Sequence, residues 1–254
     1  MVARLALLVL VLLGITVASA GAAPVVPWQL LATYPHDPTA FTQGLVSYQG
    51  VLLESTGLKG QSSIRRVDPQ TGVVLARVPL AASLFGEGLT VLGGKAVQLT
   101  WTDHRILTYD PKTLVRLRSR VYRFVGWGLT TNGTQLIASD GTATVRWLDP
   151  TTLKVVRSIT VTDDGRAVDQ INELELRNGV LWANVWHSDR IALIDPTTGR
   201  VRAWVNLRAL RARLTTPGEV LNGIARDPIS GQVAVTGKYW SQLFVIRLTQ
   251  KIPR

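Results

Sequence analysis

Five short segments of the sequence share a pattern that places a reactive or aromatic side chain at one matching point. The segments are Gln43-Gly44-Leu45, Glu87-Gly88-Leu89, Trp127-Gly128-Leu129, Asn172-Glu173-Leu174 and Asn222-Gly223-Ile224. Their first residues supply one carboxyl group, three amides and one indole. A carboxyl group held among such groups can transfer protons to and from a bound ligand, provided that the fold brings the five points together. The alternative is a water-filled polar channel without chemistry, and position alone does not decide between the two.

Tryptophan and lysine residues follow a second set of apolar segments. They end the stretches Gln98-Leu99-Thr100-Trp101, Ala183-Asn184-Val185-Trp186 and Thr236-Gly237-Lys238. A tryptophan usually packs into a core, because exposing its large side chain to water is unfavourable. Several tryptophans near one carboxyl group and one lysine are instead typical of an apolar pocket with a few convergent polar groups. The pattern therefore favours a small-ligand site.

Turns that repeat along the chain indicate the strands that must position these residues. Asp-Pro pairs occur at Asp68-Pro69, Asp110-Pro111, Asp149-Pro150, Asp195-Pro196 and Asp227-Pro228. The first four have a threonine two positions after the proline and lie between segments that alternate apolar and polar residues, which predicts hairpins between β-strands. The five segments that begin at Gln43, Glu87, Trp127, Asn172 and Asn222 recur at steps of 44, 40, 45 and 50 residues. This is the length of a four-stranded propeller blade.

The two ends of the repeat favour a closed ring. From Asn222 onward only three strands fit, at residues 222–226, 232–236 and 243–248, whereas residues 28–34 form an extra strand ahead of the first blade. Pairing that strand with the last blade would complete the blade and cover exposed strand edges. The sequence therefore predicts an all-β, five-bladed β-propeller that forms a single domain over residues 24–254. The alternative is an open β-sandwich with coincidental turns.

The N-terminal residues have the pattern of a secretory signal peptide. Arg4 precedes an apolar run, residues 5–17, that is too short to span a membrane, and small residues follow it. We expect a signal peptide at residues 1–23 with cleavage near Ala20 or Ala23, and a periplasmic or secreted protein without stable membrane insertion. Since the chain has no cysteine, its stability must come from the core and from ring closure rather than from disulfides.

The charge of the chain is strongly basic, with a formal net charge of +11. Its arginines are scattered through strand-like segments rather than gathered on one helix or stripe, which argues against a nucleic-acid partner. We interpret the charge as favouring solubility and attraction to anionic envelope surfaces.

Longer stretches around these motifs form an ordered series through all five repeats. The first are Tyr34-Pro35-His36-Asp37-Pro38-Thr39-Ala40-Phe41-Thr42-Gln43-Gly44-Leu45, Gly60-Gln61-Ser62-Ser63, Phe85-Gly86-Glu87-Gly88-Leu89-Thr90 and Gly126-Trp127-Gly128-Leu129-Thr130. The later ones include Ser139-Asp140-Gly141-Thr142, Asn172-Glu173-Leu174-Glu175, Asp189-Arg190-Ile191, Leu221-Asn222-Gly223-Ile224-Ala225 and Val235-Thr236-Gly237-Lys238. The series resembles the plant and bacterial type of glutaminyl-peptide cyclotransferase, a family of five-bladed propellers.

The resemblance implies that the protein cyclises the N-terminal glutamine of peptides or proteins to pyroglutamate and releases ammonia. The implied acid and base is Glu87, and the implied polar contacts are Lys238, Gln43 and Asn172. The implied substrate-binding residues are Phe41, Trp101, Trp127 and Trp186. An N-terminal amine has a pKa near 8, so a useful fraction is already neutral and can attack its own side-chain amide. We expect a monomer that acts on such peptides or proteins.

Each of these assignments has a structural alternative. Glu87 could simply pair with Lys238 across the channel, and the side chains of Phe41 and Trp127 could simply fill the core. The residues expected to serve as channel lining, turns or ties between blades, outside the site, are Asn222, Asp140 and Asp189.

No cofactor is expected to be required. The three histidines, His36, His104 and His187, lie in separate repeats without the spacing of a zinc site. A structural calcium ion held by channel carbonyls stays open, because backbone ligands leave no trace in a sequence. One rival function is a non-catalytic protein- or ligand-binding propeller of the envelope. The other is a propeller lactonase, whose metal usually needs several channel carboxylates, whereas the ring has only Glu87, with Glu173 one position out of phase.

Overall fold

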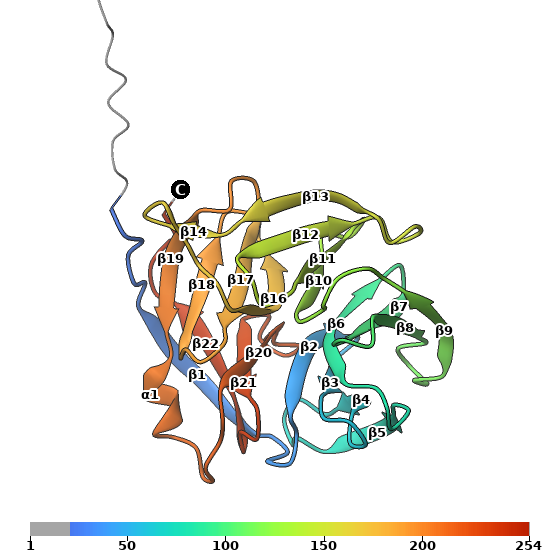
Figure 1. Ribbon diagram of the computed structural model, residues 1–254. Coiled ribbons are helices and arrows are strands. Elements are labelled where there is room, and N and C mark those ends of the chain that lie inside the picture. Colours follow the sequence, from blue (N-terminus) through green and yellow to red (C-terminus); the bar gives the residue numbers. More distant parts are fainter. Residues whose placement is uncertain (1–20, 254) are drawn as a thin grey trace, which may run out of the picture.

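The computed structural model describes residues 21–253, which form five four-stranded antiparallel sheets arranged as the blades of a propeller (Figure 1). Blade 1 consists of β2 (Thr42–Tyr48), β3 (Val51–Thr56), β4 (Ser63–Val67) and β5 (Val74–Pro79). Blade 2 consists of β6 (Gly86–Leu92), β7 (Lys95–Thr100), β8 (Arg105–Tyr109) and β9 (Arg116–Val121). Blade 3 consists of β10 (Leu129–Thr131), β11 (Leu136–Ser139), β12 (Thr144–Leu148) and β13 (Val155–Thr160). The predicted five-bladed propeller is confirmed, whereas the predicted signal peptide lies outside the described residues except for its last three.

The last two blades follow the same plan, with one strand taken from the start of the chain. Blade 4 consists of β16 (Ile171–Arg177), β17 (Val180–Val185), β18 (Arg190–Ile194) and β19 (Val201–Asn206). Blade 5 consists of β20 (Leu221–Arg226), β21 (Val233–Gly237), β22 (Gln242–Leu248) and β1 (Trp28–Pro35). Outside the blades lie a short hairpin, β14 (Thr162–Asp163) and β15 (Arg166–Ala167), and one helical turn, α1 (Arg208–Arg211).

The strand β1 lies antiparallel beside β22, so both ends of the described chain share one sheet. The register runs from the pair Trp28 and Leu248 to the pair Pro35 and Gln242. Figure 1 shows this arrangement as the blue N-terminal strand lying against the red C-terminal strands. The extra strand expected ahead of the first blade therefore supplies the outer strand that the last blade lacks.

The hairpins between the third and fourth strands explain why the Asp-Pro-x-Thr pattern repeats. Asp149 Oδ1 accepts hydrogen bonds from the backbone N–H (2.6 Å) and the hydroxyl (2.8 Å) of Thr152. Asp68 Oδ1 makes the same pair of bonds with Thr71, both at 2.8 Å. A short aspartate side chain that bonds the backbone just ahead of it stabilises a turn. The repeated motif therefore fixes where each outer strand begins.

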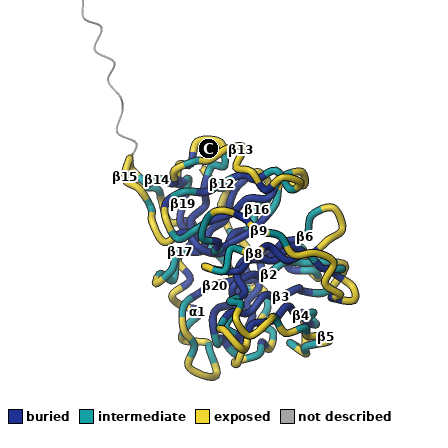
Figure 2. Tube along the Cα trace, turned by 45° about the vertical axis from the view of Figure 1, so that its right-hand side comes forward, coloured by how far each residue is buried: buried dark blue, intermediate teal, exposed yellow. Residues whose placement is uncertain are grey.

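Burial falls from the axis of the propeller to its rim. The inner strand β6 is mostly buried, whereas the outer strands β9 and β13 are mostly exposed. Figure 2 shows the same contrast, with the inner strands in dark blue and many loops in yellow. In the described chain, five clusters of buried apolar side chains fill the spaces between neighbouring blades, one cluster for each pair. Burial of this apolar surface is the main force that holds the blades together.

Near the axis the first strands approach too closely for a side chain. A Cβ atom at Gly128 would lie 2.0 Å from the carbonyl oxygen of Asn172 in the next blade. Across the preceding interface, the N–H of Gly88 donates to the carbonyl oxygen of Trp127 at 2.6 Å. Glycine is therefore needed at Gly88 and Gly128, because a side chain at either position would push the blades apart. In blade 4 the residue that follows the motif position is Glu173 instead.

A buried histidine links the last blade to the first. His36 Nδ1 lies 2.7 Å from the carbonyl oxygen of Trp240 in blade 5, and Nε2 lies 3.0 Å from Glu54 Oε1 in blade 1. Both partners are acceptors, so the geometry favours a doubly protonated ring. Burial alone would lower the pKa of His36, but the charge of Glu54, the hydrogen bonds to Glu54 and Trp240 and the charge of Asp37 together outweigh it, and the pKa is raised above 6.5. The resulting ion pair lies where the ring closes.

This histidine predicts a pH-dependent contribution to stability. Its contribution is fully present below the ordinary pKa near 6.5 and is lost as the pH rises through its raised pKa in the folded protein. We expect His36→Asn to lower the free energy of unfolding by about 3–5 kcal/mol at pH 6, since removing one partner leaves a buried charge. The difference from the unmodified protein should shrink toward pH 9. Urea unfolding at both pH values measures it.

The matched control for this prediction is His104→Asn. The His104 ring makes one hydrogen bond, from Nδ1 to the carbonyl oxygen of Phe124 (2.8 Å), and has no carboxylate partner in the described chain. Its substitution should lower the free energy of unfolding less than His36→Asn at pH 6, because it leaves no buried carboxylate without its partner. A His36→Asn effect that stays constant between pH 6 and pH 9 would contradict the assignment of an ion pair.

Candidate active site

Irregular pairing at the start of the first strand of four blades directs four polar side chains toward the propeller axis. The register between the first and second strands shifts between Thr42 and Gly44, between Gly86 and Leu89, between Ile171 and Leu174, and between Leu221 and Ile224. The four shifts contain the motif residues Gln43, Glu87, Asn172 and Asn222. A bulge of this kind changes the direction of a side chain and is common next to active sites. The repeat seen in the sequence therefore marks a local distortion that turns polar side chains toward the axis.

The loops after the second strands lie at the same end of the propeller as these bulges. Trp101 follows β7, Trp186 follows β17 and Lys238 follows β21. Because neighbouring strands are antiparallel, the end of a second strand lies beside the beginning of the first strand. The topology therefore brings the residues of the two sequence patterns to one face.

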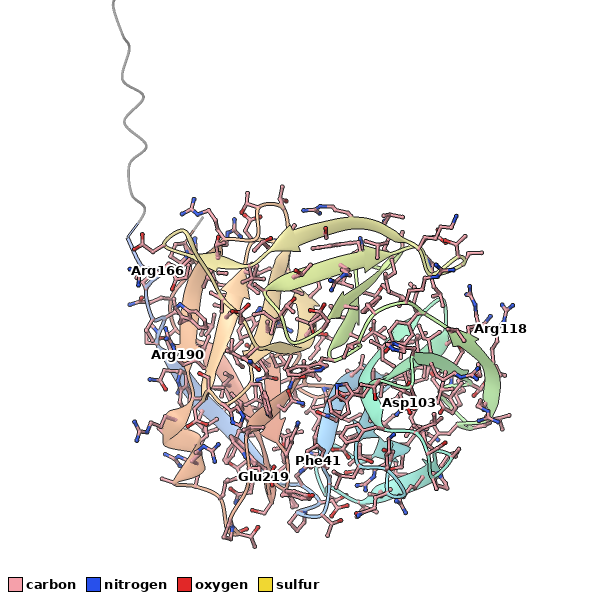
Figure 3. The ribbon with its side chains drawn as sticks, viewed as in Figure 1. Phe41, Asp103, Arg118, Arg166, Arg190 and Glu219 are labelled. Atoms are coloured by element: carbon pink, nitrogen blue, oxygen red, sulfur yellow. The ribbon has the colours of Figure 1, made fainter. Side chains whose placement is uncertain are left out.

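A cavity of about 190 Å³ opens where these elements meet. It is lined by Phe41, Gln43, Phe85, Glu87, Trp101, Trp127, Asn172, Trp186 and Lys238. All eight residues predicted for the site line it, together with Phe85. Figure 3 shows the side chains over the whole molecule and labels Phe41, next to the start of β2. We call this cavity the indole pocket.

The aromatic side chains of the indole pocket contact one another edge to face. The rings of Trp127 and Trp186 lie 5.4 Å apart at 87°, and those of Phe41 and Phe85 lie 6.0 Å apart at 88°. Phe85 also lies 5.6 Å from the ring of Trp101. Edge-to-face pairs hold rings in a defined geometry. The aromatic residues therefore form a fixed apolar wall.

Phe85 belongs to this wall although it was not predicted for the site. Its N–H donates to Asp103 Oδ2 at 2.9 Å, which fixes the loop before β6. A Cβ atom at Gly57 would lie 2.5 Å from the Phe85 ring and 3.0 Å from the Phe41 ring, so only glycine leaves room for both. The sequence contains a usable signal, because Phe85 precedes Glu87 by two residues just as Phe41 precedes Gln43.

Glu87 is the one carboxyl group that lines the indole pocket. Its residue is 3 % exposed, and its Oε2 atom has no hydrogen-bond partner in the described chain. Burial raises its pKa well above the ordinary 4.5, while the positive charge of Lys238 opposes that rise. In the part of the chain that the structure describes, Glu87 and Lys238 do not form a direct ion pair. The alternative of a simple structural pair is therefore not what the structure contains.

Lys238 faces both the aromatic wall and the carboxyl group. Its Nζ lies 4.3 Å from the centre of the Phe41 ring, which is a cation–π contact. Burial lowers the pKa of Lys238, and the carboxylates of Glu87 and Glu219 act in the opposite direction. The pocket thus holds one acid and one base whose pKa values are shifted toward each other, an arrangement typical of acid–base sites.

The amide side chains in and beside the indole pocket differ in which of their polar atoms have a hydrogen-bond partner. Asn222 Nδ2 donates to Gln43 Oε1 at 3.2 Å and to the carbonyl oxygen of Thr42 at 2.9 Å. These bonds fix Gln43 so that its amide nitrogen is free to donate. The Oδ1 atom of Asn172 is buried and lacks a hydrogen-bond partner among the described residues. Asn222 itself does not line the cavity, in agreement with the role in the channel lining expected for it.

The two aspartates left outside the site serve the scaffold. Asp140 Oδ2 lies 2.5 Å from Arg146 Nη1 within blade 3, and Asp189 Oδ1 accepts from Arg211 Nε at 2.6 Å. Neither lines the indole pocket. Both aspartates thus make structural contacts outside the pocket.

No metal cluster accompanies the pocket within the described range. Among residues 21–253, no three histidine, cysteine, aspartate or glutamate side chains gather so as to hold an ion. The same residues include no helix with the length and apolar character needed to span a bilayer.

Comparison with known proteins assigns the family. The family model described as glutamine cyclotransferase matches residues 4–248, which include every blade and every residue of the indole pocket. The chain belongs to the glutamine cyclotransferase family. A curated glutamine cyclotransferase relative, the glutaminyl-peptide cyclotransferase of Arabidopsis thaliana, is 44 % identical over 229 residues, which are 87 % of this chain and 71 % of that protein.

A solved structure supports the same assignment for the fold. The glutaminyl cyclase of Myxococcus xanthus superposes with a TM-score of 0.81 at 37 % identity, and the match covers 90 % of this chain and 98 % of that one. The chain therefore matches the glutamine cyclotransferase family both in its sequence and in its five-bladed fold.

Proposed function

We propose that this glutamine cyclotransferase cyclises the N-terminal glutamine of peptides and proteins in the indole pocket, forming pyroglutamate and releasing ammonia. The observation that carries the proposal is a single buried carboxyl group, with its pKa raised, in a cavity whose other walls are five aromatic side chains, two amides and one lysine. A volume of about 190 Å³ suits one side chain rather than a folded domain. The family assignment supports the same reaction.

Positioning is the first task of the pocket. The N-terminal amine must approach the Cδ carbon of its own glutamine side chain, so the chain has to fold back on itself. Rings of Trp127 and Trp186 at 5.4 Å, with Phe41 and Phe85 opposite, form rigid walls for that conformer. Holding reacting groups in contact removes much of the entropic barrier. The same walls exclude water, which would otherwise hydrolyse the side chain to glutamate.

Proton transfer is the second task, and we assign it to Glu87. The neutral amine attacks Cδ and forms the new N–Cδ bond, while the carbonyl π electrons move to the oxygen. The carboxylate of Glu87 takes a proton from the attacking nitrogen and delivers it to the departing amide nitrogen. The Cδ–Nε2 bond then breaks, the carbonyl re-forms, and ammonia leaves. A raised pKa suits a group that must both accept and donate a proton near neutral pH.

The polar side chains around Glu87 have complementary roles in this scheme. We assign stabilisation of the oxyanion to Lys238 and to the free amide nitrogen of Gln43, because both are donors held in the cavity. The unpartnered Oδ1 of Asn172 is an acceptor, which suits the N–H of the attacking amine. Every step is thus assigned to a side chain and none requires a metal ion.

Export is also part of the proposal. We propose that residues 1–23 direct the protein out of the cytoplasm and that the mature enzyme acts as a monomer in the periplasm or the medium. Near the cleavage region, Ala23 N–H donates to Asp163 Oδ1 at 2.7 Å, and Trp204 N–H donates to the carbonyl oxygen of Pro24 at 2.8 Å. Cleavage after Ala20 would preserve both bonds, so we favour that site over Ala23.

A mass measurement tests the reaction. Purified protein incubated with a glutamine-initiated peptide should convert it to a product lighter by one ammonia, far faster than the spontaneous reaction. The same peptide with an acetylated N-terminus should not react, because its nitrogen is no longer a nucleophile. Conversion at only the spontaneous rate would favour the non-catalytic binding propeller instead.

A further inference from the structure

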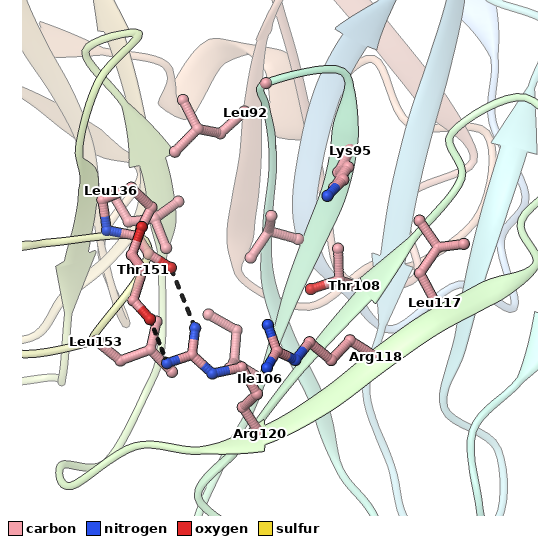
Figure 4. Close-up of a pocket in the computed structure, with 13 residues that line it drawn as sticks. Leu92, Lys95, Ile106, Thr108, Leu117, Arg118, Arg120, Leu136, Thr151 and Leu153 are labelled. Atoms are coloured by element: carbon pink, nitrogen blue, oxygen red, sulfur yellow. Dashed lines mark hydrogen bonds between the residues drawn. The ribbon is translucent and has the colours of Figure 1, made fainter.

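A second and larger cavity, of about 380 Å³, lies between blades 2 and 3 at the rim of the propeller (Figure 4). Its apolar lining consists of Leu92, Val97, Ile106, Leu117, Leu136 and Leu153. Three cationic side chains, Lys95, Arg118 and Arg120, also line it, and no aspartate or glutamate does. We call this cavity the rim pocket.

The cations of the rim pocket converge although they repel one another. Figure 4 shows the guanidinium groups of Arg118 and Arg120 directed toward the same space, with the ammonium group of Lys95 above them. Arg120 is held there by bonds to the carbonyl oxygens of Pro150 (3.2 Å) and Thr151 (2.5 Å). Neither Lys95 nor Arg118 has an ion-pair partner in the described chain. Like charges in such proximity are stabilised by an anion between them.

Asp149 does not balance this group of cations. Its hydrogen bonds to the N–H and hydroxyl of Thr152 are the main cause that lowers its pKa, and the charge of Arg120 adds to them. Asp149 can therefore balance the charge of Arg120 at most. The charges of Lys95 and Arg118 remain available to a ligand.

Exposed aliphatic side chains occur on β9 and β13, the outer strands of the two blades that form the rim pocket. The most exposed are Val115, Leu117 and Val121 in and before β9, and Val155 and Val156 in β13. Leu117, which lines the pocket, is 53 % exposed. Val155, which pairs with Leu148 of the apolar cluster between blades 2 and 3, is 48 % exposed. The strands β9 and β13 also contain no acidic residue. A surface that combines exposed aliphatic groups with cations is typical of contact with an anionic membrane interface.

The rim pocket and the indole pocket lie at opposite ends of the blades. The rim pocket includes Leu92 and Lys95 from the hairpin between β6 and β7, and Pro150 and Thr151 from the hairpin after β12. The indole pocket is formed by the loops at the other ends of the strands. A molecule bound at the rim therefore leaves the entrance to the indole pocket free.

We propose that the rim between blades 2 and 3 docks onto an anionic phospholipid bilayer. Lys95 and Arg118 bind a lipid phosphate, while Leu117 and Val155 enter the boundary between headgroups and acyl chains. The exposed aliphatic groups favour a bilayer over a soluble anion, which would gain nothing from them. Docking in this orientation holds the enzyme at a membrane surface with its active site open to substrate.

Vesicle sedimentation tests the proposal. The mature protein should bind vesicles that contain phosphatidylglycerol in phosphatidylcholine, bind pure phosphatidylcholine poorly, and dissociate as salt rises. Each basic side chain near an anionic surface contributes about 1 kcal/mol, so the variant Lys95→Gln with Arg118→Gln should bind about thirtyfold more weakly. The variant Leu117→Ser with Val155→Ser, which keeps every charge, should also bind more weakly. All variants should retain normal cyclisation of a short soluble peptide.

The matched control removes two charges elsewhere. Arg208 and Arg213 are exposed and make no side-chain bond that involves a described residue. The variant Arg208→Gln with Arg213→Gln should keep nearly full vesicle binding. An equal loss in this control would show a non-specific effect of net charge and overturn the proposal. Unchanged binding by Lys95→Gln with Arg118→Gln, or by Leu117→Ser with Val155→Ser, would overturn it as well.

Discussion

Glu87→Gln is expected to lower kcat by about a hundredfold to ten-thousandfold, the usual contribution of a positioned acid and base. The substitution keeps the shape of the side chain and removes only its ability to carry a proton between the two nitrogens. Substrate positioning by the aromatic walls should survive, so KM should change little. Steady-state rates of ammonia release from a glutamine-initiated peptide measure both values.

The same variant should be at least as stable as the unmodified protein. A carboxyl group whose pKa is raised by folding contributes its full stability below the ordinary value of 4.5 and loses it as the pH rises through the raised pKa. Glutamine carries no charge at any pH. The melting temperature of Glu87→Gln relative to the unmodified protein should therefore increase from pH 5 to pH 9.

Glu175→Gln is the control for a carboxyl group outside the site. Burial raises the pKa of Glu175 to about 7, yet the residue does not line the indole pocket. Its substitution should leave kcat near normal. Near-normal turnover in Glu87→Gln, or an equal loss in Glu175→Gln, would contradict the assignment of proton transfer to Glu87.

Lys238→Met should lower kcat on the order of a hundredfold or more, as the loss of an oxyanion donor usually does. Methionine fills similar space without a charge or a donor. Because the charge of Lys238 lowers the pKa of Glu87, its removal should raise that pKa further. The proposed base acts as a carboxylate, so activity is lost as the pH falls through this pKa. The acid limb of the kcat/KM profile should therefore move to higher pH.

Lys59→Met is the matched control on the same face. The side chain of Lys59 is 56 % exposed and pairs with Asp103 at 3.6 Å, outside the indole pocket. Its loss should change neither kcat nor the position of the acid limb. A Lys238→Met enzyme with a normal kcat and an unmoved acid limb would exclude Lys238 from the reaction.

The residues of the site were largely predictable because they recur at the same position within each repeat. Gln43, Glu87 and Asn172 occupy one position of successive blades, and a propeller brings equivalent positions together around its axis. Trp101 and Trp186 likewise occupy equivalent positions, each directly after the second strand of its blade. Sequence periodicity therefore replaces the distance information that a sequence otherwise lacks.

Features that depend on contacts across the repeat could not be predicted. The bulge at Glu87 depends on the register of β6 against β7, and the pair of His36 with Glu54 joins two blades across the closure. The basic residues Lys95 and Arg118, which lie far apart in the sequence, meet at the rim pocket. Each of these arises from packing between elements, for which the local pattern carries no signal.

The pairing of β1 with β22 also sets the order in which the enzyme becomes functional. Phe41 follows β1, while Lys238 precedes β22, so the two meet only when those strands join. A chain emerging from the ribosome has made four blades before that last strand exists. Its catalytic site is therefore completed only after β22 has been made, and a nascent chain that lacks β22 cannot act on any N-terminal glutamine near it.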